Sequence, residues 1–325
     1  MIKISEIKPG TKGVKFQAVI SKKEKRSFSN KPGNYLELEL SDASGRVSAK
    51  KWKDIELFEE IQSGDVVEIK GDSSEYRGQV QITVHKMVKV TDFNPADFIA
   101  AYSDDEIQNS LNSIMEIVEN IKNTHIKKLI ELFYNDKETY ELFKQAPAAK
   151  GYHHNKVGGL AIHTFGVMRL CKNICDTYKI SGIEKDILLT GALFHDIGKI
   201  TEYEYSTKID ITDAGRLLGH ISIGLIYVNS LIEKIPDFPK EKADIIKHLI
   251  ISHHGEYEWG SPKRPKTLAA QILHFADNLD SKIEGISAII SNGKQNGNTW
   301  SSNYDGRAFL ISLPEDENNN EQELF

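Results

Sequence analysis

Along the first 90 residues, hydrophobic and polar positions alternate with the two-residue period of half-buried β-strands. The clearest runs cover residues 14–20, 35–40, 46–50, 65–71 and 79–84. Residues 42–45 (DASG) predict a hairpin turn, residues 55–61 a short helical segment, and residues 73–78 a polar loop between the last two strands. Five short strands within about 80 residues are typical of a small all-β barrel.

After residue 105 the pattern changes to the three- and four-residue spacing of helices. Apolar residues recur in this way over 107–121, 127–133 and 137–143, and residues 187–194 form a continuous apolar run. We therefore expect a barrel domain over residues 1–92, a linker over 93–105 and an all-α helical bundle over 106–312. The Asn- and Glu-rich residues 313–325 predict an acidic, disordered tail.

The charge is distributed unevenly between the two parts of the chain. The formal net charge is −6, but residues 1–92 carry 17 Lys and Arg against 14 Asp and Glu, or +3, which leaves −9 for the remainder. Because bound cations would neutralise some of the acidic groups, the net charge does not exclude a nucleic-acid partner.

The chain shows neither a secretory signal nor an apolar stretch near the 20 residues that span a bilayer. We therefore expect a cytoplasmic protein with no membrane partner. The two cysteines, Cys171 and Cys175, lie four residues apart on one predicted helix face, where disulfide geometry is poor. We interpret them as reduced residues without a metal role.

Two segments of the predicted barrel, "SGDVVEIKG" and "YRGQVQI", follow a strand, a long basic loop and a hairpin. This order resembles an OB-fold of the type fused to nucleic-acid enzymes. Basic and aromatic side chains of such a domain can hold phosphates and stack on bases. The candidates are Lys22, Lys23, Lys25, Arg26 and Phe28, placed in the first long loop, and Trp52, Tyr76 and Arg77. The alternative for each is a solvated turn or an aromatic that packs within the domain.

Histidines are the most informative residues of the second half of the chain. His195 and Asp196 end the apolar run 187–194, where an imidazole and a carboxylate are costly to bury unless a charge satisfies them. A divalent metal is the economical solution, and nitrogen with oxygen donors suits Zn, Mn, Fe, Ni or Co. His163 and Asp277, on other predicted helices, would complete such a site. A single histidine on an apolar helix is more often a hydrogen-bonded core residue, so the interpretation depends on the whole set.

Five helix-borne motifs occur in the order H…HD…H…HH…D, and this pattern resembles the HD superfamily of metal-dependent phosphohydrolases. With the barrel ahead of it, the resemblance narrows to the YhaM-like 3'-to-5' exoribonucleases of bacteria. The segments "HHNKVGGLAIHT", "GALFHDIGK" and "ISHHGEYEWGSPKRP" carry it. It implies that the first metal binds His163, His195, Asp196 and Asp277, and that a second binds His220, His253 and His254, with Asp196 bridging the pair.

The resemblance also implies the chemistry. His195 and Asp196 would belong to the catalytic centre, where the metal activates water for attack on phosphorus, and Lys199 could place a cation on the scissile phosphate. His153 and His154 are weaker candidates for substrate contacts, and His248 and His274 are interpreted as structural. The implied cofactor is one or two divalent ions, manganese first, with cobalt, iron, nickel, zinc and magnesium as alternatives.

The function that follows is 3'-to-5' hydrolysis of single-stranded RNA, and as an alternative substrate single-stranded DNA, to nucleoside 5'-monophosphates. One rival is a phosphodiesterase or nucleotidase for a small or cyclic nucleotide. A rival of another class is a non-catalytic nucleic-acid-binding protein. Residues 293–313, with Trp300, Tyr304 and Arg307, predict either a late strand or a subunit contact, so homo-oligomerisation stays open.

Overall fold

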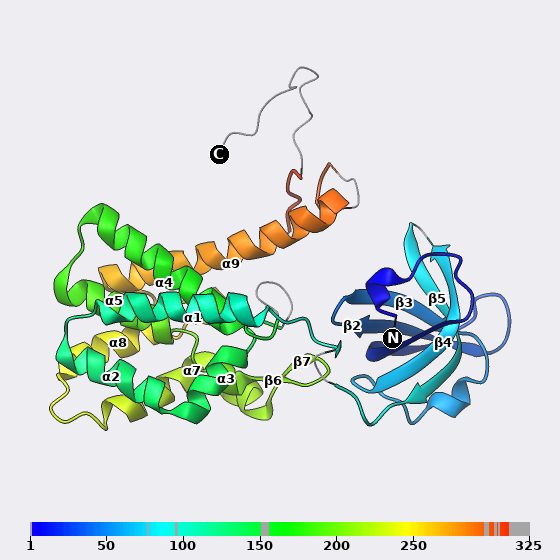
Figure 1. The fold of residues 1–325 in the computed structure, drawn as a ribbon, viewed down its shortest axis with the longest axis horizontal. Coiled ribbons are helices and arrows are strands. Elements are labelled where there is room, and N and C mark those ends of the chain that lie inside the picture. Colours follow the sequence, from blue (N-terminus) through cyan, green and yellow to red (C-terminus); the bar gives the residue numbers. More distant parts are fainter. Residues whose placement is uncertain are drawn as a thin grey trace, which may run out of the picture.

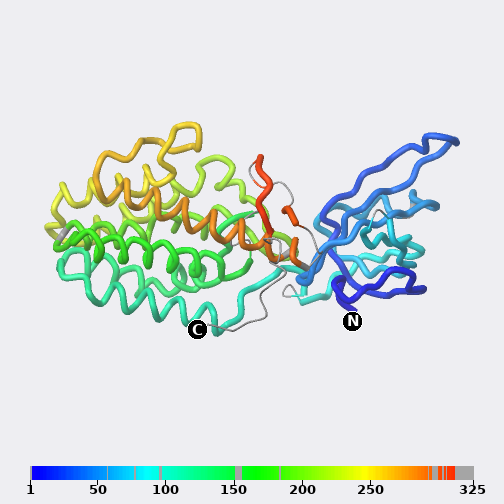
Figure 2. Tube along the Cα trace, turned by 90° about the horizontal axis from the view of Figure 1, so that it is seen from above, coloured from blue at the N-terminus to red at the C-terminus, as the bar shows by residue number. Residues whose placement is uncertain are grey.

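The computed structural model describes residues 2–76, 78–94, 97–150, 156–295, 299–301, 304 and 306–311. A closed all-β barrel and a mostly helical domain lie at opposite ends of an elongated molecule (Figure 1). Seen from above, the same two bodies are joined by a narrow connecting region (Figure 2). The expected fold class is therefore confirmed. Arg77, His153, His154 and the predicted tail 313–325 lie outside the described residues.

The barrel is closed by five strands in the order β1-β2-β3-β5-β4, with β4 pairing back to β1. Among the described strands of this barrel, β3 and β5 are the one parallel pair. Its core is filled by the alternate side chains of the strands, such as Phe16, Leu38 and Ile69, which are almost fully buried. The elements are η1 (Ile4–Glu6), β1 (Val14–Ser27), β2 (Asn34–Asp42), β3 (Gly45–Lys51), η2 (Ile55–Phe58), β4 (Val66–Tyr76) and β5 (Gln79–Lys89).

The prediction of a loop was wrong for the basic residues Lys22 to Arg26, whereas Phe28 does lie in the loop that follows β1. Lys22, Lys23, Lys25 and Arg26 continue β1 and pair with β2, with a register shift between Ile20 and Lys22. Beyond this shift β1 pairs with β2 alone, because its pairing with β4 ends at Val19. A two-stranded ribbon has little apolar surface to bury, so its sequence lacks the alternation by which strands are recognised.

The predicted polar loop over residues 73–78 was also wrong for most of its length. β4 continues to Tyr76, and Ser73 to Tyr76 pair with Ile82 to Gln79 of β5. These residues again form a two-stranded extension, in which Ser74, Glu75 and Tyr76 are exposed, whereas Ser73 is buried and its hydroxyl donates to Lys8 O. The turn is therefore shorter than the sequence predicted.

The segment predicted as a linker is in contact with both domains. Phe93 and Phe98 pack against Val19 and Val66 of the barrel, and Phe98 is buried. At the other end of the segment, backbone hydrogen bonds join residues 100 and 102 to residue 157 ahead of the helical domain. The connection is thus anchored on each side.

The helical domain is built around α5, the helix predicted from the apolar run. Its residues Leu188, Ala192 and Phe194 are fully buried, and α4, α8 and α9 pack against it. The elements are α1 (Asp104–Glu119), α2 (Thr124–Asn135), α3 (Lys137–Gln145), α4 (Gly159–Tyr178), α5 (Gly182–Phe194), α6 (Lys199–Glu202), β6 (Tyr203–Tyr205), β7 (Ile209–Ile211), α7 (Asp213–Ile232), α8 (Lys240–Ser252), η4 (Tyr257–Trp259) and α9 (Leu268–Gln295).

Helix α7 is long and apolar enough to cross a membrane by length and composition alone, although no membrane span was predicted from the sequence. Its backbone leaves helical geometry at Gly219, and it packs against α6 and α8 of the helical domain. Buried helices of a protein core meet the same criterion, so this feature is weak support for a membrane span.

The two cysteines of the chain lie on one helix. Cys171 and Cys175 are both free and buried on α4, and burial raises the pKa of each thiol. Near the C-terminus, antiparallel bridges join Trp300 to Leu310 and Tyr304 to Arg307, so these described residues form short strand-like pairs.

Candidate metal centre and nucleic-acid interface

Four of the predicted donors converge from three helices of the helical domain. His163 comes from the second turn of α4, His195 and Asp196 follow the last residue of α5, and Asp277 lies on α9. His163 Nε2 lies 3.2 Å from His195 Nε2, 3.4 Å from Asp196 Oδ2 and 3.2 Å from Asp277 Oδ1. The structure therefore brings the whole first predicted set together.

Three histidines form a second set beside the first. His220 follows the kink of α7, and His253 and His254 follow the end of α8. The three imidazoles lie close enough for one ion to contact all of them, with His220 Nε2 3.3 Å from His254 Nε2. The second predicted set is thus also assembled.

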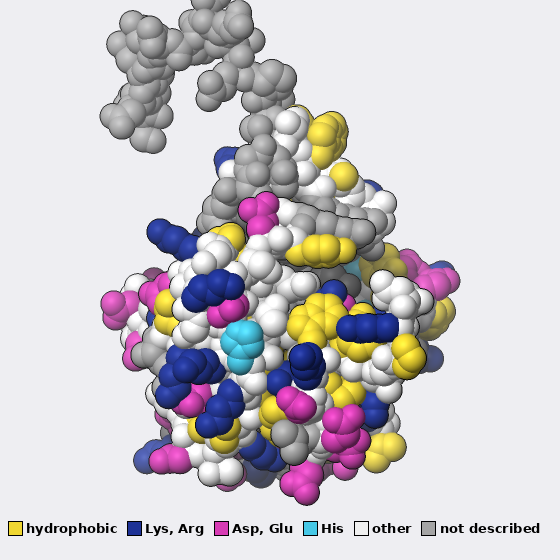
Figure 3. Space-filling model, turned by 90° about the vertical axis from the view of Figure 1, so that its right-hand side faces the viewer, with side chains coloured by type: hydrophobic (Ala, Val, Ile, Leu, Met, Phe, Trp, Pro, Cys, Tyr) yellow, Lys and Arg dark blue, Asp and Glu magenta, His cyan; other side chains and the backbone are white. Residues whose placement is uncertain are grey.

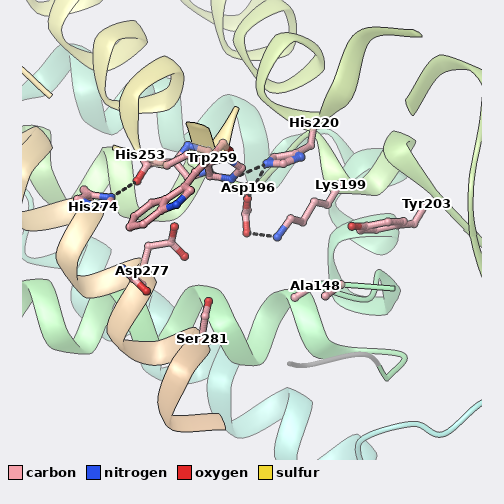
Figure 4. A pocket seen from close by; sticks show the side chains of 13 residues that line it. Ala148, Asp196, Lys199, Tyr203, His220, His253, Trp259, His274, Asp277 and Ser281 are labelled. Atoms are coloured by element: carbon pink, nitrogen blue, oxygen red, sulfur yellow. Dashed lines mark hydrogen bonds and ion pairs between the residues drawn. The ribbon is translucent and has the colours of Figure 1, made fainter. Parts of the chain in front are cut away.

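Asp196 joins the two sets, with one oxygen directed toward each. Its Oδ2 lies 3.4 Å from both His163 Nε2 and His195 Nε2, while its Oδ1 lies 3.5 Å from both His220 Nε2 and His253 Nε2. Figure 4 shows this carboxylate between the histidines and Asp277. A single carboxylate placed in this way can bridge two neighbouring cations.

The spacing of the donor atoms fits metal ligation. Ligands held about 2.1 Å from a metal in a tetrahedral arrangement lie about 3.4 Å from one another, close to the separations found here. Asp196 Oδ1 and His253 Nε2 are buried, and neither has a hydrogen-bond partner among the described residues. Because unsatisfied buried polar atoms are costly, these two atoms indicate that a cation belongs between them.

All five histidines are oriented in the same way, with Nδ1 against an oxygen and Nε2 toward the centre. The Nδ1 distances are 2.8 Å from His163 to Asp280 Oδ2, 2.8 Å from His195 to Ala192 O, 3.0 Å from His220 to Glu202 Oε2, 2.7 Å from His253 to Ile250 O, and 2.9 Å from His254 to Trp259 O. When Nδ1 donates its proton to such an oxygen, Nε2 of the neutral ring is left with the lone pair that binds metal.

The pKa shifts of His253 and His254 agree with neutral imidazoles. Burial, together with neighbouring His253 and His220, lowers the pKa of His254 to about 3, and burial also lowers the pKa of His253. Their Nε2 atoms would therefore be unprotonated at neutral pH, and the Nε2 of His253 faces the carboxylate oxygen Asp196 Oδ1. The lone pairs of these two atoms repel each other, and a cation bound between the two atoms would remove this repulsion.

In the first set of donors, neighbouring carboxylates determine the direction of the pKa shift of His163. Burial disfavours the charged form of His163, but Asp196, Asp277 and Asp280 outweigh it and raise its pKa well above the usual range. Burial likewise disfavours the ionised form of Asp196, yet Lys199 and His195 hold its pKa well below the usual range. This cluster of carboxylates favours a bound cation.

Lys199 was predicted to lie at the mouth of the site, and it lines the cleft there. Its Nζ lies 2.6 Å from Asp196 Oδ2, and the side chain is largely buried. Figure 4 shows the lysine extending from α6 toward the carboxylate. The ammonium group of Lys199 therefore lies next to the carboxylate of Asp196, which joins the two sets of donors.

A cleft of about 350 Å³ opens over the metal donors. Several residues that the sequence did not single out line it: Ala148, Ala149, Tyr203, Trp259, Asn278 and Ser281. His274, interpreted as structural, also lines the cleft, while its Nδ1 is held 2.8 Å from His253 O. His248, also interpreted as structural, accepts a hydrogen bond from the Lys266 backbone at 2.9 Å.

The carboxylates that orient the metal-binding histidines were also not predicted from the sequence, although the spacing along the chain indicates one of them. Asp280 lies three residues after Asp277 on α9, and that spacing places both on one helix face. Glu202 ends α6 and contacts the ring of His220, whose hydrogen bond outweighs burial and lowers the pKa of Glu202. Its partner lies 18 residues away, beyond the hairpin of β6 and β7, so no local spacing indicates the pair.

The barrel carries an aromatic cluster on its surface. Phe28, Tyr35 and Trp52 lie with ring centroids 5.0 to 6.1 Å apart. Lys50 Nζ lies 5.7, 5.4 and 5.5 Å from the rings of Tyr35, Trp52 and Tyr76. Figure 3 looks onto this end of the molecule, where lysine and arginine side chains stand beside apolar ones. Tyr35 and Lys50 were not predicted, because both appeared to be ordinary residues of a strand.

The predicted basic residues of β1 divide into two groups. Lys22, Lys25 and Arg26 are exposed and lie in ion pairs with Glu24, Glu59 and Glu37. Lys23 instead donates to the backbone oxygens of Phe58 at 2.7 Å and Ile61 at 2.5 Å. These contacts give Lys23 a structural role in holding η2 against the barrel.

Two family models match the chain, an HD domain over residues 160–282 and an OB-fold nucleic acid binding domain over residues 14–90. The fold and the histidine–aspartate site thus define an HD-domain protein with an OB-fold nucleic acid binding domain. Relatives match along most of the chain. The 3'-5' exoribonuclease YhaM of Bacillus subtilis (strain 168) is 33% identical over 274 residues, which cover 82% of this chain and 84% of the relative.

Two more relatives carry the same name. The YhaM of Bacillus licheniformis is 33% identical over 287 residues (85% of this chain and 83% of the relative), and that of Listeria innocua serovar 6a is 31% identical over 270 residues (80% and 82%). The chain belongs to the YhaM family of 3'-5' exoribonucleases.

Proposed function

We propose that this protein is a metal-dependent 3'-to-5' exoribonuclease that hydrolyses single-stranded RNA to nucleoside 5'-monophosphates. The observation that carries the proposal is the bridging position of Asp196 between two sets of donors at the base of a cleft. The barrel supplies the second part, a surface of aromatic and cationic side chains suited to single strands. Single-stranded DNA is the second substrate to be tested, and the proposed location is the cytoplasm.

The metal set is proposed to hold two divalent ions. His163, His195, Asp196 and Asp277 would hold one, and His220, His253, His254 and the other oxygen of Asp196 the second. Nitrogen and oxygen donors without thiolates suit manganese, with cobalt, iron, nickel, zinc and magnesium as alternatives. Bound ions of this kind lower the pKa of water and neutralise charge on phosphoryl oxygens.

The residues of the chain prepare the site for hydrolysis. Lys199, beside Asp196, places a positive charge where a phosphate enters the cleft, which offsets the negative charge that develops during attack. Asp280 and Glu202 fix the rings of His163 and His220. Attack by water would break the bond between phosphorus and the 3'-oxygen of the preceding nucleotide. The phosphate would therefore remain on the 5'-oxygen of the released nucleotide.

The barrel is proposed to retain the strand while its end is cut. Phe28, Tyr35, Trp52 and Tyr76 would stack on bases, while Lys50 and the exposed Lys22, Lys25 and Arg26 would meet phosphates. A tethered strand raises the local concentration of its own 3' end at the cleft. Arg77, His153 and His154 stay predicted substrate contacts outside the described residues.

The test is a product ladder from 5'-end-labelled single-stranded RNA and DNA incubated with Mn, Mg, Zn or Co. We expect stepwise shortening from the 3' end that EDTA stops and that the double substitution His195→Ala, Asp196→Ala abolishes while RNA is still retained in a gel shift. Intact oligonucleotides with every metal would contradict the proposal. Equal hydrolysis of a cyclic dinucleotide by the isolated helical domain and the full chain would instead favour a small-molecule phosphodiesterase.

A further inference from the structure

Trp259 lines the cleft, and it supports the metal donors through its backbone and not through its side chain. It belongs to η4, and 56% of its surface is exposed. Its ring lies 5.8 Å from that of His274 at an angle of 37°. Figure 4 shows the indole beside His253 and Asp277, at the rim of the space above the donors. A large apolar ring therefore faces the place where a substrate would enter.

The backbone of Trp259 is fixed to the metal centre. Its carbonyl oxygen lies 2.9 Å from His254 Nδ1, and its amide donates to Glu256 O at 3.1 Å. Just beyond, the buried hydroxyl of Ser261 donates to Ile251 O and Lys263 O, which holds the end of the loop against α8. The indole is thus carried by a loop whose position is set by one of the metal donors.

Gly255 allows this loop to turn back over the cleft. Its φ of +81° is the left-handed conformation that favours glycine, and a Cβ there would lie 2.2 Å from Cε1 of His274. The chain can therefore turn directly after His254 and bring Trp259 to the rim. A rigid support of this kind makes an exposed aromatic ring a prepared binding surface, because little side-chain and loop entropy remains to be lost on binding.

We propose that Trp259 stacks on the base of the 3'-terminal nucleotide and thereby places that nucleotide's phosphate over the metal donors. The inference rests on the proposed exoribonuclease function and names a substrate contact within it. A cleft of about 350 Å³ is near the lower end of the usual range for small-ligand pockets, roughly 300 to 1,000 Å³, and suits one nucleotide. Every base has a face to stack, so one indole serves all four as the enzyme steps along the strand.

A binding experiment tests the stacking without requiring hydrolysis. The affinities of adenosine 5'-monophosphate and of ribose 5-phosphate, which lacks the base, are measured by calorimetry with and without manganese. For the unaltered protein we expect adenosine 5'-monophosphate to bind about tenfold or more tightly than ribose 5-phosphate. Trp259→Ala should remove this preference, and Trp259→Phe should restore most of it. Trp300→Ala is the matched control, because Trp300 is equally exposed at 58% and does not line the cleft.

A preference for the base that survives unchanged in Trp259→Ala would overturn the proposal. Hydrolysis of RNA with an abasic 3'-terminal nucleotide adds a second readout. The unaltered enzyme should cleave this substrate with about tenfold or lower kcat/KM than normal RNA, whereas Trp259→Ala should cleave both at similar reduced rates. A protein that binds adenosine 5'-monophosphate through Trp259 but leaves all RNA intact would contradict the proposed exoribonuclease, not the stacking.

Discussion

His163 Nδ1 lies 2.8 Å from Asp280 Oδ2, a contact that joins α4 to α9 and turns Nε2 of the histidine toward the other metal donors. Gly166 makes room for this carboxylate, since a Cβ at that position would lie 2.0 Å from Asp280 Oδ1. Asp280 is therefore placed to set the tautomer of His163 and the basicity of its Nε2.

Asp280→Ala is expected to weaken manganese binding about 10- to 100-fold, the usual effect of removing a carboxylate that supports a ligating histidine. Asp280→Asn should lose less, because its amide oxygen can still accept the proton of Nδ1. Manganese titration by calorimetry measures both. Asp244→Ala is the control, since Asp244 is exposed on α8 and forms an ion pair with nearby Lys247. Unchanged affinity in Asp280→Ala would show that the carboxylate does not support the site.

Manganese should raise the unfolding temperature, because it binds only where the folded chain assembles its donors. At a concentration 100 times its Kd the added stability is about 2.7 kcal/mol, and EDTA should remove it. His253→Ala, which removes a buried donor facing Asp196, should reduce this gain. Thermal unfolding with and without metal gives the answer, and an equal gain in the variant would exclude His253 as a ligand.

Trp52→Ala should lower the affinity for single-stranded RNA by about 5- to 100-fold, since stacking contributes about 1 to 3 kcal/mol per base. Fluorescence anisotropy in EDTA measures binding without hydrolysis. Because Trp52 lies in the barrel cluster, its loss should leave the binding of adenosine 5'-monophosphate unaltered. Trp300→Ala again serves as the control. Equal RNA affinities of Trp52→Ala and the unaltered protein would place the RNA elsewhere.

The neighbouring lysines of β1 should behave differently. Lys23→Ala removes a charged donor from two backbone oxygens and should lower the free energy of unfolding by about 1 to 3 kcal/mol. Lys22→Ala should leave stability within about 0.5 kcal/mol but weaken RNA binding and reduce its dependence on salt. Urea unfolding and anisotropy at several salt concentrations separate the two effects. Lowered stability in Lys22→Ala together with unchanged stability in Lys23→Ala would contradict the roles given to these residues.

The predicted metal donors converge in the structure, and part of the signal for them is physical. His195 and Asp196 interrupt an apolar helix, and such a pair at the end of α5 can be buried only beside other charged or donor groups. The roles of His220, His253 and His254 followed from the resemblance to the HD superfamily, and the structure brings all seven predicted donors into two clusters. The barrel was predictable in the same way, because its inward-facing side chains alternate along each strand.

What the sequence did not reveal depends on tertiary packing. Glu202 meets His220 only after the β6–β7 hairpin reverses the chain, and Lys50 meets Tyr35 across two paired strands. The outer ends of β1 and β4 lacked apolar alternation because they bury little surface. Trp259 lay within a recognised motif, yet its position at the cleft follows from the turn at Gly255.

The central claim is that Asp196 bridges two divalent ions, one in each set of donors. The most direct measurement is the anomalous diffraction of crystals grown with manganese, collected at the manganese absorption edge. The account predicts two anomalous peaks, one among His163, His195 and Asp277 and one among His220, His253 and His254, with an Asp196 oxygen at each. Crystals with manganese at only one set of donors, or at neither, would contradict it.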